Sequence, residues 1–238
     1  MKVRTLKGMS IAGILMLIDR LSSFLPLKRM FDKGFIDRAT FSENIIIGDY
    51  TSTLHLFVIA MIIFVFTEEY INEQSIISQL VRYGDVKRWY RNRIGKTTVL
   101  AFLMSVIYAG IEVVCCCMYA DRKLIVKHGI VESSLLQIIV LTLYLMLVWH
   151  LKEYMRIFHT VLVSQLITVF SLTAFYFIIS YVLFPMDDKL GFIEIIGKYC
   201  RAEYQILDCV GIIVWLSGII FIAYQSMLST RRRRDLWL

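Results

Sequence analysis

Apolar residues in this chain are gathered into blocks of roughly 17 to 25, and this pattern constrains the fold more than any other feature. As a helix rising about 1.5 Å per residue, such a block matches the hydrocarbon thickness of a bilayer. Of the 238 residues, 58% are hydrophobic and 19% are charged, so the chain is more apolar and less charged than a soluble domain. Alternating runs of about ten residues, which an outer-membrane barrel needs, are absent. The sequence predicts an all-α polytopic membrane protein.

We interpret the apolar blocks as six transmembrane helices that form one domain over residues 1–238. These spans are expected at about 7–27, 51–67, 98–118, 134–150, 160–184 and 209–228. The first block is also similar to a signal peptide, but no small-x-small cleavage site follows it. Three connecting segments are long enough to contribute structure of their own: 28–50, 68–97 and 185–208.

Lysine and arginine are distributed unequally between the two sides of the predicted bundle. The side of the N-terminus has 15 of them and the opposite side has 10. Cytoplasmic loops carry the excess of basic residues, so both termini are predicted to be cytoplasmic. The net charge of +7 is therefore attributed to basic residues that flank the spans, and not to a surface that binds nucleic acid. Near the C-terminus, Arg231 and Arg232 begin a basic run that suits an anchor on anionic lipid.

The cytoplasmic segment 68–97 contains a predicted interfacial helix from Glu68 to Trp89. Ile76, Leu80 and Tyr83 form an apolar stripe at helical spacing, and Gly84 is placed to end the helix. The basic and aromatic residues that follow suit the headgroup zone, and the predicted anchor consists of Lys87, Arg88 and Trp89. Two interpretations are open: a helix that anchors the bundle at the membrane surface, or a coupling helix that presses against a cytoplasmic partner.

Residues 82–89, RYGDVKRW, lead directly into the third span. This sequence resembles the RYG-x-(R/K)-(R/K)-W pattern in permease subunits of bacterial type-2 ABC exporters, with one extra residue before the basic pair. The small members associated with bacteriocin or peptide-antibiotic export and self-protection are the most similar. Six spans, cytoplasmic termini and a large exterior segment before the last span extend the resemblance to the whole chain.

The resemblance implies a multi-pass subunit in the cytoplasmic membrane of a bacterium, without catalytic residues or cofactors of its own. ATP and Mg would be bound by a partner ATPase, and a second permease subunit, identical or related, would complete a pathway for an amphiphilic or peptide-like substrate. The predicted ATPase-docking residues are Ile76, Leu80, Arg82, Tyr83 and Gly84. The alternative is a stand-alone six-span immunity or sensor protein that binds a peptide or toxin without transport.

Two short motifs suggest enzymatic chemistry but do not complete the required pattern. Gly95-Lys96-Thr97 would need a glycine five positions earlier for a phosphate-binding loop, where this chain has Tyr90. Glu68-Glu69 is similar to the paired glutamates of intramembrane CAAX-type proteases, but the arginine of that pattern is replaced by Glu73. We therefore expect a protein that is not an enzyme and has no metal site.

Ionisable residues inside predicted spans are costly and usually face the bundle interior with a partner. Arg20 and Glu112 lie at a similar depth in the first and third spans, which makes an Arg20–Glu112 pair possible beside Asp19. Such a pair would either stabilise the bundle or line a substrate path.

The exterior segment 185–208 is too apolar for a plain loop, and we expect a short helix there before the sixth span. Cys200 and Cys209 both fall on the exterior side, where they either form a disulfide or remain thiols.

Overall fold

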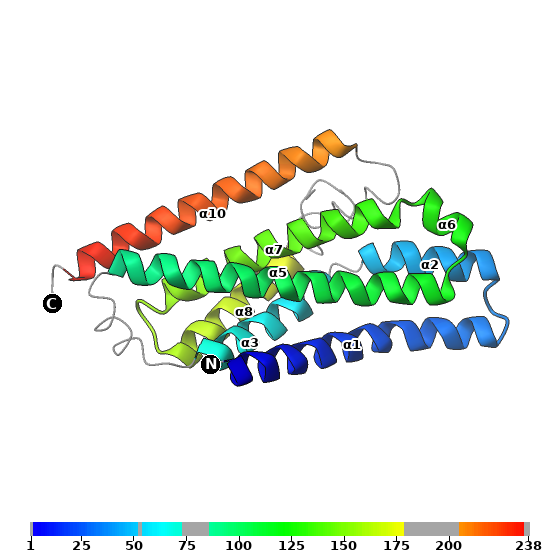
Figure 1. The fold of residues 1–238 in the computed structure, drawn as a ribbon, viewed down its shortest axis with the longest axis horizontal. Coiled ribbons are helices and arrows are strands. Elements are labelled where there is room, and N and C mark those ends of the chain that lie inside the picture. Colours follow the sequence, from blue (N-terminus) through cyan, green and yellow to red (C-terminus); the bar gives the residue numbers. More distant parts are fainter. Residues whose placement is uncertain (1, 52–53, 73–85, 179–204, 236–238) are drawn as a thin grey trace.

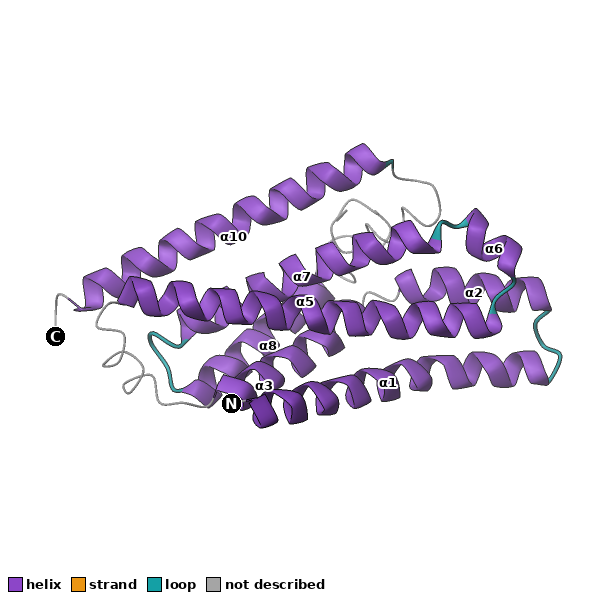
Figure 2. Ribbon diagram, viewed as in Figure 1, coloured by secondary structure: helices purple, strands orange, loops and turns teal. Residues whose placement is uncertain are grey.

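The computed structural model describes residues 2–51, 54–72, 86–178 and 205–235. Every regular element in these ranges is a helix, and Figure 2 shows them with short connecting loops. The all-helical prediction is therefore confirmed for this part of the chain. In chain order the helices are α1 (Lys2–Asp32), α2 (Arg38–Thr51), the π-helix η1 (Leu54–Ile59), α3 (Ala60–Asn72), α5 (Val86–Tyr119), α6 (Arg122–Lys127), α7 (Ile130–Met155), α8 (Val161–Phe177) and α10 (Ile206–Asp235).

Within the described ranges, four helices are long and apolar enough to cross a membrane. The segments that meet this criterion are Arg4–Asp32, Tyr90–Tyr119, Ile130–Met155 and Ile206–Thr230. With 25 to 30 residues each, they exceed the roughly 20 residues that hydrocarbon requires. They correspond to the first, third, fourth and sixth predicted spans. The chain therefore has the helices of a membrane-embedded protein.

The second and fifth predicted spans are less regular. The structure divides span 51–67 between η1 and α3, and span 160–184 corresponds to α8, which has 17 residues. Neither is among the four long apolar helices, and residues 179–204 lie outside the described part of the chain. The six-span topology, the cytoplasmic termini and the helix within 185–208 therefore stay predictions.

Helix α5 is central to the bundle. It packs most extensively against α7 and also contacts α1, α2 and α3, while α10 lies along α7. The start of α1 and the end of α10 lie at one end of the bundle, together with the end of α3, the start of α5 and the end of α7 (Figure 1). We call this the terminal end. The opposite end, where α2 and α6 lie, we call the distal end.

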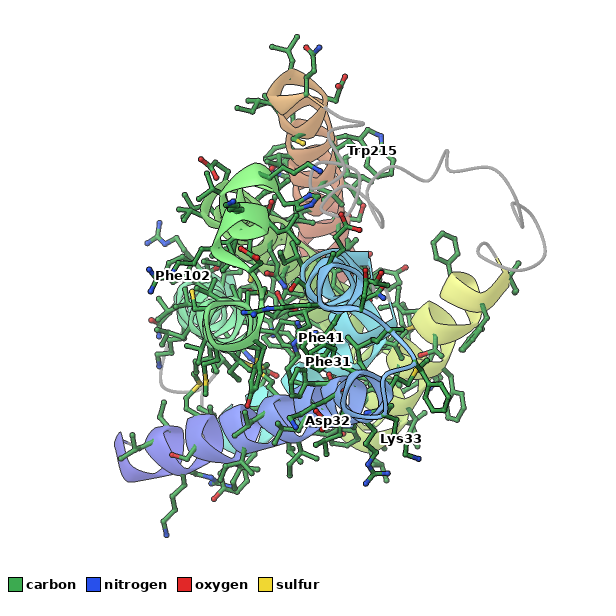
Figure 3. The ribbon with its side chains drawn as sticks, turned by 90° about the vertical axis from the view of Figure 1, so that its right-hand side faces the viewer. Phe31, Asp32, Lys33, Phe41, Phe102 and Trp215 are labelled. Atoms are coloured by element: carbon green, nitrogen blue, oxygen red, sulfur yellow. The ribbon has the colours of Figure 1, made fainter. Side chains whose placement is uncertain are left out.

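Side chains are sorted between the bundle interior and its outer surface. Met104 and Trp149 are fully buried, whereas Phe102 and Trp215 are exposed and point away from the bundle (Figure 3). Exposed aromatic residues of this kind suit a surface in contact with lipid rather than water. Near the terminal end, α1 approaches α3 closely at Gly8, where a Cβ would lie 2.9 Å from Cγ1 of Ile71. A larger residue at this position would require the Ile71 side chain to shift.

At the distal end, α1 continues past its predicted end at residue 27. It includes Pro26 and ends where Gly34 adopts a φ of 73°. The Phe35 N–H donates to the Met30 carbonyl at 3.0 Å, and the Gly34 N–H donates to the Phe31 carbonyl at 2.9 Å. These two bonds form a Schellman motif, in which glycine accepts the left-handed conformation without steric cost.

The predicted connecting segment 28–50 contains a packed helix, α2. The Asp37 carboxylate caps it by accepting a hydrogen bond from the Thr40 N–H at 2.8 Å. Hydrogen bonds from the Thr40 side chain and then its backbone lower the pKa of the Asp37 carboxyl. Phe41 of α2 stacks on Phe31, with ring centroids 4.5 Å apart (Figure 3). This small apolar cluster fixes α2 against the end of α1.

Candidate functional site

Six charged side chains meet at the terminal end, and we call them the six-charge cluster. Two come from the last turns of α3, one from the early turns of α5 and three from the end of α7. Three are acidic and three are basic, so their formal charges cancel. The members are Glu68, Glu69, Arg93, Lys152, Glu153 and Arg156.

Arg93 and Lys152 connect the three helices. Nη2 of Arg93 lies 3.3 Å from Oε1 of Glu68 and 3.0 Å from Oε1 of Glu153, so the guanidinium joins α3 to α7 through α5. Nζ of Lys152 contacts Oε2 of Glu68 and lies 3.2 Å from Oε2 of Glu69. These contacts attach the end of α7 to both glutamates of α3.

Arg156 closes the arrangement. Its Nη1 lies 3.3 Å from Oε2 of Glu69 and 3.4 Å from Oε1 of Glu153. Each carboxylate of the cluster therefore has two cationic partners, and each cation has two carboxylates. The result is a closed ring of alternating charge, in the order Glu68, Arg93, Glu153, Arg156, Glu69, Lys152 and back to Glu68.

The ring is largely removed from solvent. The Glu68 and Glu153 side chains are 0% exposed and that of Lys152 is 1% exposed. Oε1 of Glu68 also accepts a hydrogen bond from Nε1 of Trp149 at 3.2 Å. Removing one member of a buried ion pair typically costs about 3–5 kcal/mol, because the remaining charge loses its compensation. The closed ring is therefore a strong joint between α3, α5 and α7.

An aromatic layer lies against the ring. Trp149 stacks on Tyr90 with centroids 5.3 Å apart, and Tyr90 stacks on Tyr224 of α10 at 5.7 Å. His150 packs edge-on to all three rings, and its Nδ1 donates to the Met146 carbonyl at 2.7 Å. This layer connects α10 to the same joint.

The carboxylates of the ring are engaged by cations, and His150 is bonded to backbone. Among the described residues, no group of three or more histidine, cysteine, aspartate or glutamate side chains is placed to hold a metal ion. What the ring does physically is to tie three helices together at one end.

The predicted interfacial helix from Glu68 to Trp89 differs from the structure at both ends. Glu68 and Glu69 belong to α3, and α5 already begins at Val86. The predicted docking residues Ile76, Leu80, Arg82, Tyr83 and Gly84 lie in 73–85, outside the described residues. Both flanks of 73–85 nevertheless contribute to the ring, Glu68 and Glu69 on one side and Arg93 on the other.

The predicted anchor residues lie at the terminal end. Lys87, Arg88 and Trp89 are in the first turn of α5, while Arg231 and Arg232 are in the last turns of α10 (Figure 1). Their placement on one end of the bundle is compatible with a shared interface. Their role as anchors stays a prediction.

Arg20 and Glu112 meet in a second buried group, which we call the Asp19 cluster: Asp19, Arg20, Tyr108 and Glu112. Arg20 is 4% exposed and Glu112 is 1% exposed, on the contacting helices α1 and α5. Asp19, Arg20 and Glu112 all lie close enough to Tyr108 to act on it electrostatically, and Arg20 and Glu112 act on Cys115 in the same way. The structure thus brings both predicted partners into one cluster between α1 and α5, and the pairing itself stays a prediction.

Cys209 is a free thiol in the structure and is 3% exposed. Its predicted partner Cys200 lies outside the described residues, so the disulfide between them stays a prediction.

The sequence interpretation missed the ring. Lys152, Glu153 and Arg156 counted only in the balance of charge between the two sides of the predicted bundle. The available signal was the coincidence of Glu68-Glu69 at the end of one apolar block with Lys152-Glu153 at the end of another. Opposite charges at the same depth are expected to pair where their helices are neighbours.

No protein-family model, curated protein or solved structure matches this chain.

Proposed function

We propose that this chain is the membrane-spanning permease subunit of an ATP-driven exporter in the cytoplasmic membrane of a bacterium. The observation that carries the proposal is that residues on both sides of segment 73–85 in the sequence belong to the ring. Glu68 and Glu69 precede this segment, Arg93 follows it, and all three are joined to the end of α7. A segment fastened in this way transmits a push from a cytoplasmic partner to three helices together.

The resemblance of residues 82–89 to type-2 ABC permeases supplies the identity of that partner, an ATPase subunit. Closure of the ATPases on ATP and Mg would press on 73–85, and the ring would carry the displacement into α3, α5 and α7. Because separating the ring exposes buried charges, these three helices are expected to move as one body. A second permease subunit, identical or related, would form the other half of the pathway.

The substrate class follows from the surface that the helices offer. The four long helices are rich in apolar and aromatic side chains, and fixed charges within them are few. An amphiphilic or peptide-like molecule suits such a surface better than a small ion does. ATP hydrolysis is assigned to the partner, since Gly95-Lys96-Thr97 does not complete a phosphate-binding loop.

The direct test is co-purification of the full chain with its ATPase subunit from membranes. The variant Arg82→Glu/Arg88→Glu reverses one charge at the predicted contact and one in the neighbouring predicted anchor, and it is expected to lose the ATPase. The matched control is Arg122→Glu/Lys123→Glu, which reverses two exposed charges of α6 at the distal end. The control should retain the partner, with equal amounts of both variants in the membrane.

Two outcomes would overturn the proposal. One is an intact, functional complex that contains no ATPase subunit. The other is full function of the Arg82→Glu/Arg88→Glu variant. Binding of a peptide by the purified chain alone, with no ATPase in the native complex, would favour the stand-alone immunity or sensor protein instead.

A further inference from the structure

A groove of about 490 Å³ opens on the side of the bundle near the terminal end, between α1, α3 and α5. Thr5 and Met9 of α1 form one wall, and Ile71 of α3 closes one end. The close approach of α1 to α3 at Gly8 brings these two helices together beside Ile71. The remaining wall is one face of α5.

That face of α5 is a ladder of residues spaced four apart. Arg91, Gly95, Val99 and Leu103 follow one another along the groove, and all four are exposed. Residues four apart lie above one another on a helix, so they form a continuous strip. Gly95 leaves the strip hollow, because a Cβ at this position would meet no atom within 4 Å. The hollow lies directly between a cationic and an apolar side chain.

The groove changes from basic to apolar along its length. Arg91 and Lys96 line the part of the groove nearest the start of α5, and Val99 and Leu103 line it further along the helix. After Lys96, α5 carries no charged residue before Glu112. In a membrane helix this transition marks the level at which headgroups give way to hydrocarbon. The basic residues therefore lie at headgroup level, and the apolar residues lie where acyl chains run.

The charge of the groove is positive without local compensation from its lining. None of the described residues that line it is acidic. The nearest acidic pair along the chain, Glu68-Glu69, is engaged by the cations of the ring. Two exposed cations above an apolar hollow complement a ligand with an anionic head and a hydrocarbon tail.

We propose that this groove binds one anionic phospholipid of the leaflet at the terminal end. Its phosphate would lie between Arg91 and Lys96, and an acyl chain would run over Gly95 toward Val99 and Leu103. Basic pockets between transmembrane helices are suited to anionic headgroups, with each basic residue near the surface contributing about a fivefold factor in affinity. A zwitterionic headgroup has no net charge and gains little from the two cations.

The test measures lipid binding to the purified full chain by native mass spectrometry and by titration with phosphatidylglycerol or phosphatidylcholine. The wild-type chain is expected to retain phosphatidylglycerol preferentially. Arg91→Gln/Lys96→Gln should weaken that binding about 30-fold while leaving phosphatidylcholine unchanged. Its control is Arg122→Gln/Lys123→Gln, which removes two exposed cations outside the groove.

A second variant, which changes shape and not charge, still tests the proposal if the charge variant misfolds. Gly95→Leu fills the hollow and should lower phosphatidylglycerol binding at least tenfold. Gly110→Leu is the matched control, since Gly110 is also exposed on α5 with nothing within 4 Å of its Cβ but lies outside the groove. Size-exclusion profiles and helical circular dichroism report folding for all variants.

Equal binding of the two lipids to the wild-type chain would overturn the proposal, as would unchanged phosphatidylglycerol binding in Gly95→Leu. A dimer that weakens in Gly95→Leu, with lipid retention unchanged, would show instead that a second copy of the chain covers the groove. That result would also overturn it.

Discussion

The six-charge cluster and the Asp19 cluster each include a buried charged residue of α5, yet they differ in charge balance. The ring has three cations for three carboxylates, whereas the Asp19 cluster has one guanidinium, that of Arg20, beside the carboxyls of Asp19 and Glu112. Arg93 and Glu112 are 19 residues apart, or about 28 Å along the helix. The two clusters thus lie nearly one hydrocarbon thickness apart.

This difference indicates two kinds of buried charge. A closed, balanced ring resists any change in a single member, because each substitution leaves an uncompensated ion. By formal charge, Arg20 of the Asp19 cluster keeps a carboxyl beside it when either Asp19 or Glu112 is neutralised. We therefore expect the ring to be a fixed joint and the Asp19 cluster to be the adjustable one. Substitutions in both clusters test this contrast, and one at an exposed cap provides a baseline.

The largest effect is expected for Glu68→Gln. The amide group keeps the shape of the side chain but carries no charge to neutralise Arg93 and Lys152. It also places an amide, in place of a carboxylate, beside the Trp149 N–H. The free energy of unfolding, measured by sodium dodecyl sulfate titration in mixed micelles, should fall by about 3–5 kcal/mol. Glu43→Gln, at an exposed position of α2, is the control. If Glu68→Gln and Glu43→Gln lowered the free energy of unfolding equally, the ring would contribute no more to stability than an exposed charge, and the contrast between the clusters would fail.

The next effect concerns coupling between Arg20 and Glu112. Arg20→Met removes the guanidinium of the Asp19 cluster and Glu112→Met removes one of its two carboxyls, while the double variant removes both side chains. If the residues pair, the double variant should be more stable than the sum of the single effects predicts, by about 0.5–3 kcal/mol. The same unfolding titration measures all three variants. A double variant no better tolerated than either single variant would contradict the pairing.

A direct comparison of the clusters uses the same substitution in each. Glu153→Gln deprives Arg93 and Arg156 of a shared carboxylate and should destabilise strongly. Glu112→Gln removes the excess negative charge and keeps a hydrogen-bonding group, so its cost should stay below about 1 kcal/mol. A strong loss in Glu112→Gln would show that both clusters are fixed joints.

The smallest effect is expected for the exposed carboxylate of Asp37, which provides a baseline. Its pKa is lowered in the folded chain, so the stability that its cap contributes is present above the ordinary aspartate pKa and is lost as pH falls through the folded value. The protection factors of amide hydrogens in α2, which correct for the slower intrinsic exchange at low pH, should therefore fall slightly on acidification. The variant Asp37→Asn should reduce this pH dependence, and an unchanged dependence would assign it to another group.

The two clusters also differ in how far the sequence could predict them. Arg20 and Glu112 interrupt apolar blocks, and counting residues along each block places them at a similar depth. Glu68 and Lys152 sit at block ends, where charges are ordinary. Nothing local indicates that α3 and α7 are both joined to Arg93 of α5, so the ring was not predicted.

The groove could not be predicted from the sequence either, because nothing local indicates which helices lie beside α5. In sequence, Arg91 is only one residue of the predicted cytoplasmic segment 68–97, and Gly95 and Lys96 belong to an incomplete phosphate-binding motif. Their joint role emerges because Met9 of α1 and Ile71 of α3 lie opposite them.

The sequence by itself determined the helical, membrane-compatible character of this chain and the depth of each charge. Apolar block length and charge spacing act locally, through transfer free energy and helix geometry. Only the tertiary structure decided which charges meet, where the ring closes and where a groove opens. Those features depend on the choice of neighbouring helices, which is made by packing between segments far apart in the chain.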